Sequence, residues 1–106
     1  MKLQPDFSPD TQMVSVFAPQ QSPKPWGAEH VGALLPAHID ALLLDPLPEV
    51  VLIGTGREQH LLPAALMRQL ISRRIGWEVM DTAAACRTYN ILAGEGRHVL
   101  AALMIE

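Results

Sequence analysis

The sequence predicts an α/β domain with parallel strands and crossover helices. A run over residues 49–53 that is rich in β-branched residues stops at a Gly-Thr-Gly motif at 54–56. A second short apolar segment over 77–80 stops at an Asp-Thr pair at 81–82. Apolar residues at helical spacing lie between the two segments. A strand, a helix and a second strand in this order form a right-handed βαβ unit with parallel strands.

Length and composition limit the classes of protein to consider. At 106 residues and 11.6 kDa, the chain has the size of one domain. We therefore predict a single domain over 1–106, with an extended amino-terminal arm over 1–11. The hydrophobic fraction of 49% favours strands that are buried on both faces. The net charge of -3 gives no electrostatic footprint for nucleic acid.

Three features of the sequence predict the cellular setting. One cysteine excludes an internal disulfide and fits a reducing compartment. No apolar run approaches the roughly 18 residues that span a bilayer. The first residues lack the apolar region of a secretion signal. We therefore expect a cytoplasmic protein without a membrane span.

The first half of the chain gives the weaker structural signals. A β-branched segment predicts a strand over 13–18, and three prolines predict an exposed loop over 19–25. The stretch that follows is ambiguous and could hold a short strand around 29–31. Pro36 suits the first position of a helix, which must end near Asp45 because two prolines come next.

Two helices are expected in the second half. The first follows from apolar spacing that starts at Leu62 and reaches the basic pair at 73–74. The second begins after an N-cap at Asp81 or Thr82 and runs to about residue 93, with Gly94 as its left-handed stop.

The last segment, 97–105, supports two assignments. Its leucines, alanines and methionine are good helix formers, so propensity alone predicts a helix. The nine-residue segment, which is apolar from 99 to 105 and follows two glycines, could equally form a central strand buried on both faces.

The order of these motifs resembles the Mth938-like family, small proteins of unknown biochemical function that include a mitochondrial assembly factor for respiratory complex I. The segments that carry the resemblance are 26, 35–38, 48–56, 66–70, 80–90 and 95–97. Family members place a β-hairpin before the strand expected at 13–18, and here that hairpin looks shortened or absent. The resemblance implies a three-layer domain with a mixed central sheet, in which 97–105 is a last strand antiparallel to the others.

Polar residues gather where the predicted parallel strands end. Ligands of open α/β sheets bind beyond the carboxyl ends of the strands, so the 54–57 and 81–82 loops should form one crevice. The carboxylate of Asp81 would repel an anion there, which favours a neutral group, a cation or a protein partner. The predicted binding residues are Thr55, Arg57, Asp81, Thr82, Arg87, Asn90 and Arg97.

Each of these residues also has a structural explanation. The Gly-Thr-Gly motif suits a tight turn, Asp81 suits a helix N-cap, and Arg87 could pair with Glu78 or Glu95. The amide of Asn90 could bond a neighbouring loop, and Cys86 suits a small buried thiol.

Known catalytic and cofactor motifs are absent from the sequence. The Gly-Thr-Gly motif lacks the third glycine of a dinucleotide fingerprint, which would fall at Gln59, and no Gly-Lys-Ser/Thr follows it. There is no Gly-x-Ser-x-Gly elbow, and the four histidines lack the spacing of a metal site. We predict no catalytic residue, no cofactor and no metal.

Two functions remain. The first is a non-enzymatic protein-interaction or assembly module, in which Arg57, Arg87 and Arg97 supply polar contacts to a protein partner. The resemblance points to the assembly of a respiratory or membrane complex. The second is a small-molecule-binding protein or enzyme that uses the same crevice, with Asp81 as a base.

Overall fold

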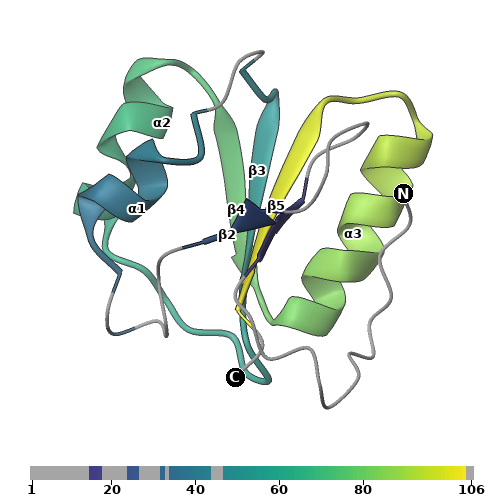
Figure 1. The fold of residues 1–106 in the computed structure, drawn as a ribbon, viewed down its shortest axis with the longest axis horizontal. Coiled ribbons are helices and arrows are strands. Elements are labelled where there is room, and N and C mark those ends of the chain that lie inside the picture. The colour runs from purple at the N-terminus through teal and green to yellow at the C-terminus, as the bar shows by residue number, and fades with distance from the viewer. Residues whose placement is uncertain (1–14, 18–23, 27–31, 33, 44–46, 105–106) are drawn as a thin grey trace.

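The computed structural model describes residues 15–17, 24–26, 32, 34–43 and 47–104. Figure 1 shows the elements that these residues form. They are, in chain order, β1 (Ser15–Phe17), β2 (Lys24–Pro25), α1 (Pro36–Asp40), β3 (Val50–Thr55), the 3-10 helix η2 (Ala64–Met67), α2 (Arg68–Ser72), β4 (Gly76–Met80), α3 (Thr82–Gly94) and β5 (Val99–Met104). None of the helices formed by these residues has the length and apolar character needed to cross a bilayer.

The strands form one mixed sheet in the order β2-β1-β5-β3-β4. β3 lies between β4 and β5 and is parallel to both. β1 is antiparallel to β5 and to β2. The α/β class, the mixed sheet and the parallel βαβ unit are therefore as predicted.

The predicted direction of the last strand is wrong. β5 runs parallel to β3, with Val50 opposite Val99 and Thr55 opposite Met104. The physical reason lies in α3, whose 13 residues carry the chain back along the sheet before β5 begins. A crossover helix of that length returns the next strand in the same direction as the one before it. The antiparallel strand beside β5 is β1.

Helices cover both faces of the sheet (Figure 1). Helices α1 and α2 lie on one face, over a core that includes Val51, Ile53 and Leu100. Helix α3 lies on the other face, over a core that includes Leu52, Tyr89 and Leu103. All six residues of β3 and all six of β5 are buried. Burial on both faces explains why 99–104 is a strand despite its helix propensity.

Several element boundaries differ from the predictions. The strand Lys24–Pro25 falls inside the expected loop, because these residues pair with β1. Helix α1 ends at Asp40, short of Asp45, and the expected helix after Leu62 is a 3-10 turn followed by α2. Gly94 remains within α3, and the glycine with positive φ after this helix is Gly96 (φ 81).

Three expectations fall outside the described residues. They are the arm over 1–11, the short strand around 29–31 and the question of a shortened amino-terminal hairpin.

Candidate functional site

Thr82 connects the ends of the parallel strands. Its backbone N–H donates to the Gly56 carbonyl at 2.8 Å, and its hydroxyl accepts from the Gly56 N–H at 2.8 Å. The same hydroxyl donates a hydrogen bond to the Met104 carbonyl at the end of β5. Thr82 is only 4% exposed. One side chain therefore links the loop after β3, the start of α3 and the end of β5.

Gly54 is required by the close approach of Thr82. A Cβ atom at position 54 would lie 2.8 Å from Thr82 Oγ1 and 2.9 Å from Thr82 Cα. The second of these atoms is backbone and cannot rotate away. Gly56 has φ 95, in the left-handed region that favours glycine. The Gly-Thr-Gly motif is thus the tight turn that its structural explanation predicted.

Thr55 folds the loop after β3 back on itself. Its buried hydroxyl donates to the Glu58 carbonyl at 2.7 Å and accepts from the His60 N–H at 3.1 Å. The Met80 carbonyl is a more distant acceptor at 3.3 Å.

Asp81 is the N-cap of α3, as its structural explanation predicted. Its carboxylate accepts from the Ala84 N–H at 2.9 Å, which satisfies one of the free donors of the first helical turn. We call Gly54, Thr55, Gly56, Asp81 and Thr82 the strand-end junction.

The other predicted residues do not converge on this junction. Arg57 is exposed in the loop after β3, Arg87 is exposed on α3, and Asn90 is half-buried on the same helix. Arg97 lies at the opposite end of the sheet, before β5. The described residues contain no ion pair that joins Arg87 to Glu78 or Glu95.

Arg97 belongs to a small polar cluster that the sequence did not reveal. Its Nε lies 3.6 Å from Glu49 Oε1, and both side chains are about half exposed. Glu49 Oε2 also accepts from the His98 N–H at 3.0 Å. The pKa of Glu49 is lowered, first by this backbone hydrogen bond and then by the positive charge of Arg97. The cluster joins the starts of β3 and β5, which are far apart in sequence.

Cys86 is a residue of α3 and is buried in the core between this helix and the sheet. Removal from water raises the pKa of its thiol to about 11, although the neighbouring Arg87 charge acts in the opposite direction. The protonated thiol is a poor nucleophile, which agrees with a packing role. The described residues hold no group of three or more metal-ligating side chains.

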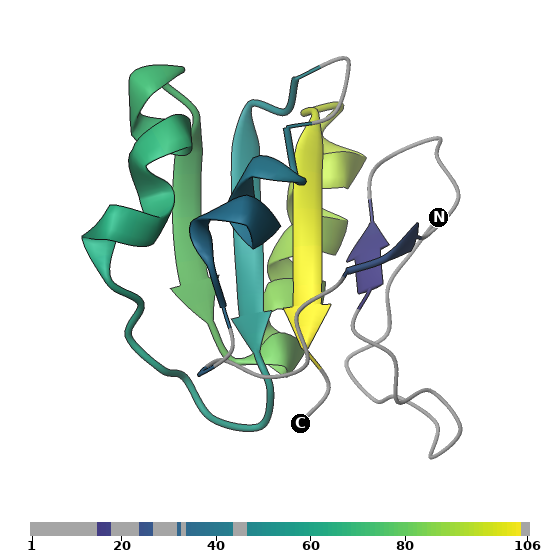
Figure 2. The same ribbon diagram turned by 60° about the vertical axis from the view of Figure 1, so that its left-hand side comes forward.

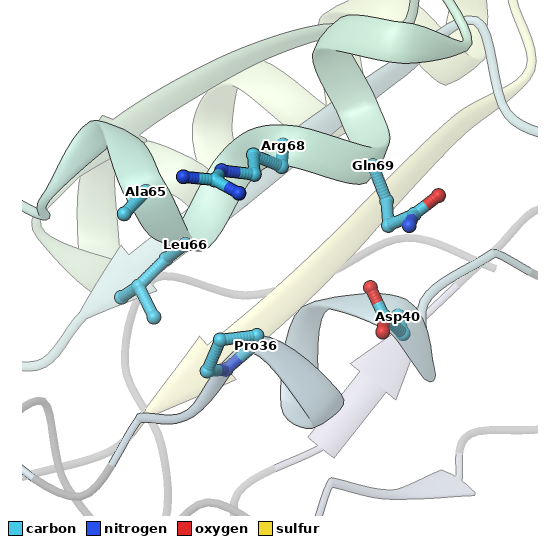
Figure 3. Close-up of a pocket in the computed structure, with 6 residues that line it drawn as sticks. All are labelled: Pro36, Asp40, Ala65, Leu66, Arg68 and Gln69. Carbon is cyan, nitrogen blue, oxygen red and sulfur yellow. The ribbon is translucent and has the colours of Figure 1, made fainter.

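A groove between α1 and the η2–α2 segment was missed by sequence reasoning (Figure 3). It has a volume of about 280 Å³. Asp40 and Gln69 extend toward each other from opposite walls, and Pro36 lies across from Leu66 (Figure 3). Ala65 and Arg68 complete the lining. Its two walls are about 25 residues or more apart in sequence, so no local pattern could have identified it.

The fold and the junction place the chain in a class of small three-layer α/β proteins. A family model for a protein of unknown function (DUF498/DUF598) matches residues 10–104, and the chain belongs to this family. The solution structure of a Mth938-like domain from Bordetella pertussis is 31% identical, with a TM-score of 0.74. The comparison covers 98% of this chain and 92% of that one. The resemblance to the Mth938-like family is confirmed.

Two relatives carry informative names. The NADH dehydrogenase (ubiquinone) 1 alpha subcomplex assembly factor 3 of Danio rerio is 44% identical over 62 residues, which are 58% of this chain and 36% of the relative. The 13 kDa major membrane protein of Francisella tularensis subsp. holarctica is 35% identical over 71 residues. That match covers 67% of this chain and 57% of the relative. The matches therefore span little more than half of the length of one relative and about a third of the other.

Proposed function

We propose that this protein is a non-enzymatic protein-interaction module that helps to assemble a respiratory or other membrane-protein complex. The observation that carries the proposal is the hydrogen bonding of the strand-end junction. The hydroxyls of Thr55 and Thr82 and the carboxylate of Asp81 all bond to the protein's own backbone. Each of these groups therefore already has a structural role in holding the turn, the start of α3 and the end of β5 together.

Other features of the chain support the same proposal. The thiol of Cys86, with a pKa of about 11, stays protonated near neutral pH. Arg57 and Arg87 are exposed, as contact residues of an interaction surface must be before the partner binds. Leu61 is 91% exposed in the same loop as Arg57, which places a large apolar side chain in water.

The relatives suggest the setting. One is named as an assembly factor for NADH dehydrogenase and another as a major membrane protein. Both names are compatible with a role in the assembly of a membrane-bound complex. We propose that this chain acts on such a complex from the cytoplasm, with a protein and not a nucleic acid as its partner.

The test is affinity purification of the tagged, cross-linked protein from its own cells, read by mass spectrometry. The paired variant combines Arg57→Ala with Leu61→Asp in one protein. Both substitutions change exposed positions and leave the core intact. The control is Leu47→Asp, which changes an apolar side chain that is 44% exposed before β3, at the opposite end of the sheet from Arg57 and Leu61. We expect a stoichiometric partner with the wild type and the control that is lost with the paired variant. A wild-type protein that captures no stoichiometric partner would contradict the proposal.

A second candidate function is small-molecule binding, and the groove of about 280 Å³ is the observation in its favour. Its lining combines the carboxylate of Asp40, the guanidinium of Arg68 and an apolar side. A ligand at about 100 times its dissociation constant adds about 2.7 kcal/mol to stability. A metabolite panel that raises the melting temperature of the wild type but not of Arg68→Ala would establish this function.

A further inference from the structure

The outer edge of β4 carries unused hydrogen-bonding capacity. β4 is the last strand of the sheet, and within the described residues it pairs only with β3. Figure 2 shows it beside β3, on the side of the sheet away from β1 and β2. An edge strand of this kind exposes a row of backbone N–H and C=O groups to any chain that can pair with them.

The register identifies the groups that face outward. Gly76 pairs with Val50, and its N–H donates to the Glu49 carbonyl at 3.2 Å. Backbone groups alternate in direction along a parallel strand, so Trp77 and Val79 direct theirs away from β3. The Val79 carbonyl confirms this direction, because it accepts from the Gln59 side chain at 3.0 Å. Among the described residues, no backbone group donates a hydrogen bond to the Trp77 carbonyl. The N–H groups of Trp77 and Val79 likewise donate to no backbone carbonyl of a described residue.

The side chains of β4 define the chemistry of the edge. Trp77 and Val79 are half-buried and pack against the core on the α1–α2 face. Glu78 lies between them on the opposite face and is exposed. The edge therefore offers two partly exposed apolar side chains on one face and a single carboxylate on the other.

A second copy of this chain does not suit the edge. Two copies of β4 related by a two-fold axis must pair antiparallel. In the register that pairs all five residues, Gly76 lies opposite Met80, Trp77 lies opposite Val79, and Glu78 lies opposite its own copy. Two carboxylates in directly opposed positions repel each other. A strand with a lysine or arginine at this position would instead form a favourable cross-strand pair.

We propose that the β4 edge docks an extended segment of a protein partner as an additional strand, with a basic residue opposite Glu78. Gln59 acts as a removable cover, because its side chain must leave the Val79 carbonyl before the partner's N–H can bond there. This inference rests on the proposed interaction function and specifies the surface and the partner's chemistry.

The experiment uses the partner recovered with the wild-type protein, expressed and purified by itself. Hydrogen–deuterium exchange is measured on the wild-type protein alone and in the reconstituted complex. We expect the amides of Trp77 and Val79 to become protected when the partner binds. This measurement needs no substitution, so a variant that fails to fold does not affect it. A complex in which both amides exchange as in the free protein would overturn the inference.

Three variants then test the edge itself. We expect Glu78→Lys to weaken binding of the purified partner by about tenfold. The control Glu95→Lys makes the same charge change beyond the end of α3 and should leave the affinity within about twofold. Gln59→Ala should strengthen binding about two- to fivefold, because it removes a hydrogen bond that competes with the partner. Equal weakening by both lysine variants, or weaker binding by Gln59→Ala, would contradict the inference.

The possible outcomes separate the two proposals. Capture of a partner whose binding leaves the β4 amides unprotected removes this inference alone. Failure of the wild type to capture any partner removes the proposed function and this inference together. Sedimentation that shows a wild-type dimer, dissociated by Val79→Pro, would assign the edge to a second copy and overturn the basic-partner proposal. Proline at this position removes an outward N–H and leaves the ladder to β3 intact.

Discussion

The strand-end junction and the β4 edge differ in how their hydrogen-bonding groups are used. At the junction, the hydroxyls of Thr55 and Thr82 and the carboxylate of Asp81 bond to nearby backbone. At the β4 edge, one outward carbonyl is covered by an exposed glutamine, and the neighbouring outward groups have no partner among the described residues. The junction is closed, and the edge is open.

This difference shows where a binding function can reside in such a small domain. A cluster of polar side chains at the carboxyl ends of parallel strands predicts a ligand site in open α/β sheets. Here those side chains hold the sheet, the turn and α3 together. The unused capacity belongs to the backbone of an edge strand, which side-chain patterns do not reveal.

Amide exchange should give the largest difference between the two regions. The Gly56 and Thr82 amides bond within the junction, so their exchange should require extensive unfolding. In the free protein, the Trp77 and Val79 amides need only a local fluctuation of the edge strand in order to exchange. We expect the edge amides to exchange at least about a thousandfold faster, measured by NMR. Equal rates would mean that the edge is already paired.

The junction should tolerate no added atom at Gly54. A methyl group there meets both the side chain and the backbone of Thr82. We expect Gly54→Ala to lower the free energy of unfolding by about 3 kcal/mol, measured by denaturant titration. Gly94→Ala is the matched control, because nothing lies within 4 Å of its added Cβ. That variant should be neutral or slightly more stable.

Removal of the Thr82 hydroxyl should also destabilise the junction. Thr82→Val keeps the shape of the side chain but leaves the Gly56 N–H and the Met104 carbonyl without this partner. Unpaired buried groups of this kind cost about 2 kcal/mol in the free energy of unfolding. Thr82→Ser keeps the hydroxyl and should retain most of the stability. A Thr82→Val protein as stable as the wild type would mean that the hydroxyl does not close the junction.

The N-cap should have a smaller effect. Asp81→Ala removes the acceptor of the Ala84 N–H and should cost about 1 kcal/mol. Asp81→Asn keeps an oxygen acceptor and should cost less. Thermal unfolding of the three proteins tests this order. If Asp81→Asn lost partner binding at wild-type stability, Asp81 would belong to the interaction surface as well as to the helix.

The opposite end of the sheet should give the smallest effect. The pKa of Glu49 is lowered in the folded protein, so the stability it contributes is present above the glutamate pKa of about 4.3 in the unfolded chain. That contribution is lost as the pH falls through the lower folded pKa. The stability difference between wild type and Glu49→Gln should therefore be larger at neutral pH than in acid. Glu95→Gln, measured over the same pH range, is the control.

The success of sequence reasoning depended on the range of the interactions involved. The turn at 54–56, the cap at Asp81 and the buried thiol of Cys86 were predicted correctly, because nearby residues determine each of them. The direction of β5 was taken from a family resemblance and was wrong. The groove beside Arg68 and the cluster around Glu49 were missed, because each joins segments that are distant in sequence.

The sequence by itself determined the α/β class, the two strand-to-helix junctions and their caps, because these features depend on glycine, aspartate and apolar spacing within a few residues. The tertiary structure alone decided the order of the strands, the direction of β5 and the edge position of β4. Those features depend on which strands pair, and pairing joins segments up to 88 positions apart, as for Ser15 and Leu103. The physical reason is that every residue except proline carries the same backbone N–H and C=O groups, so the groups that form a ladder do not specify which strands pair.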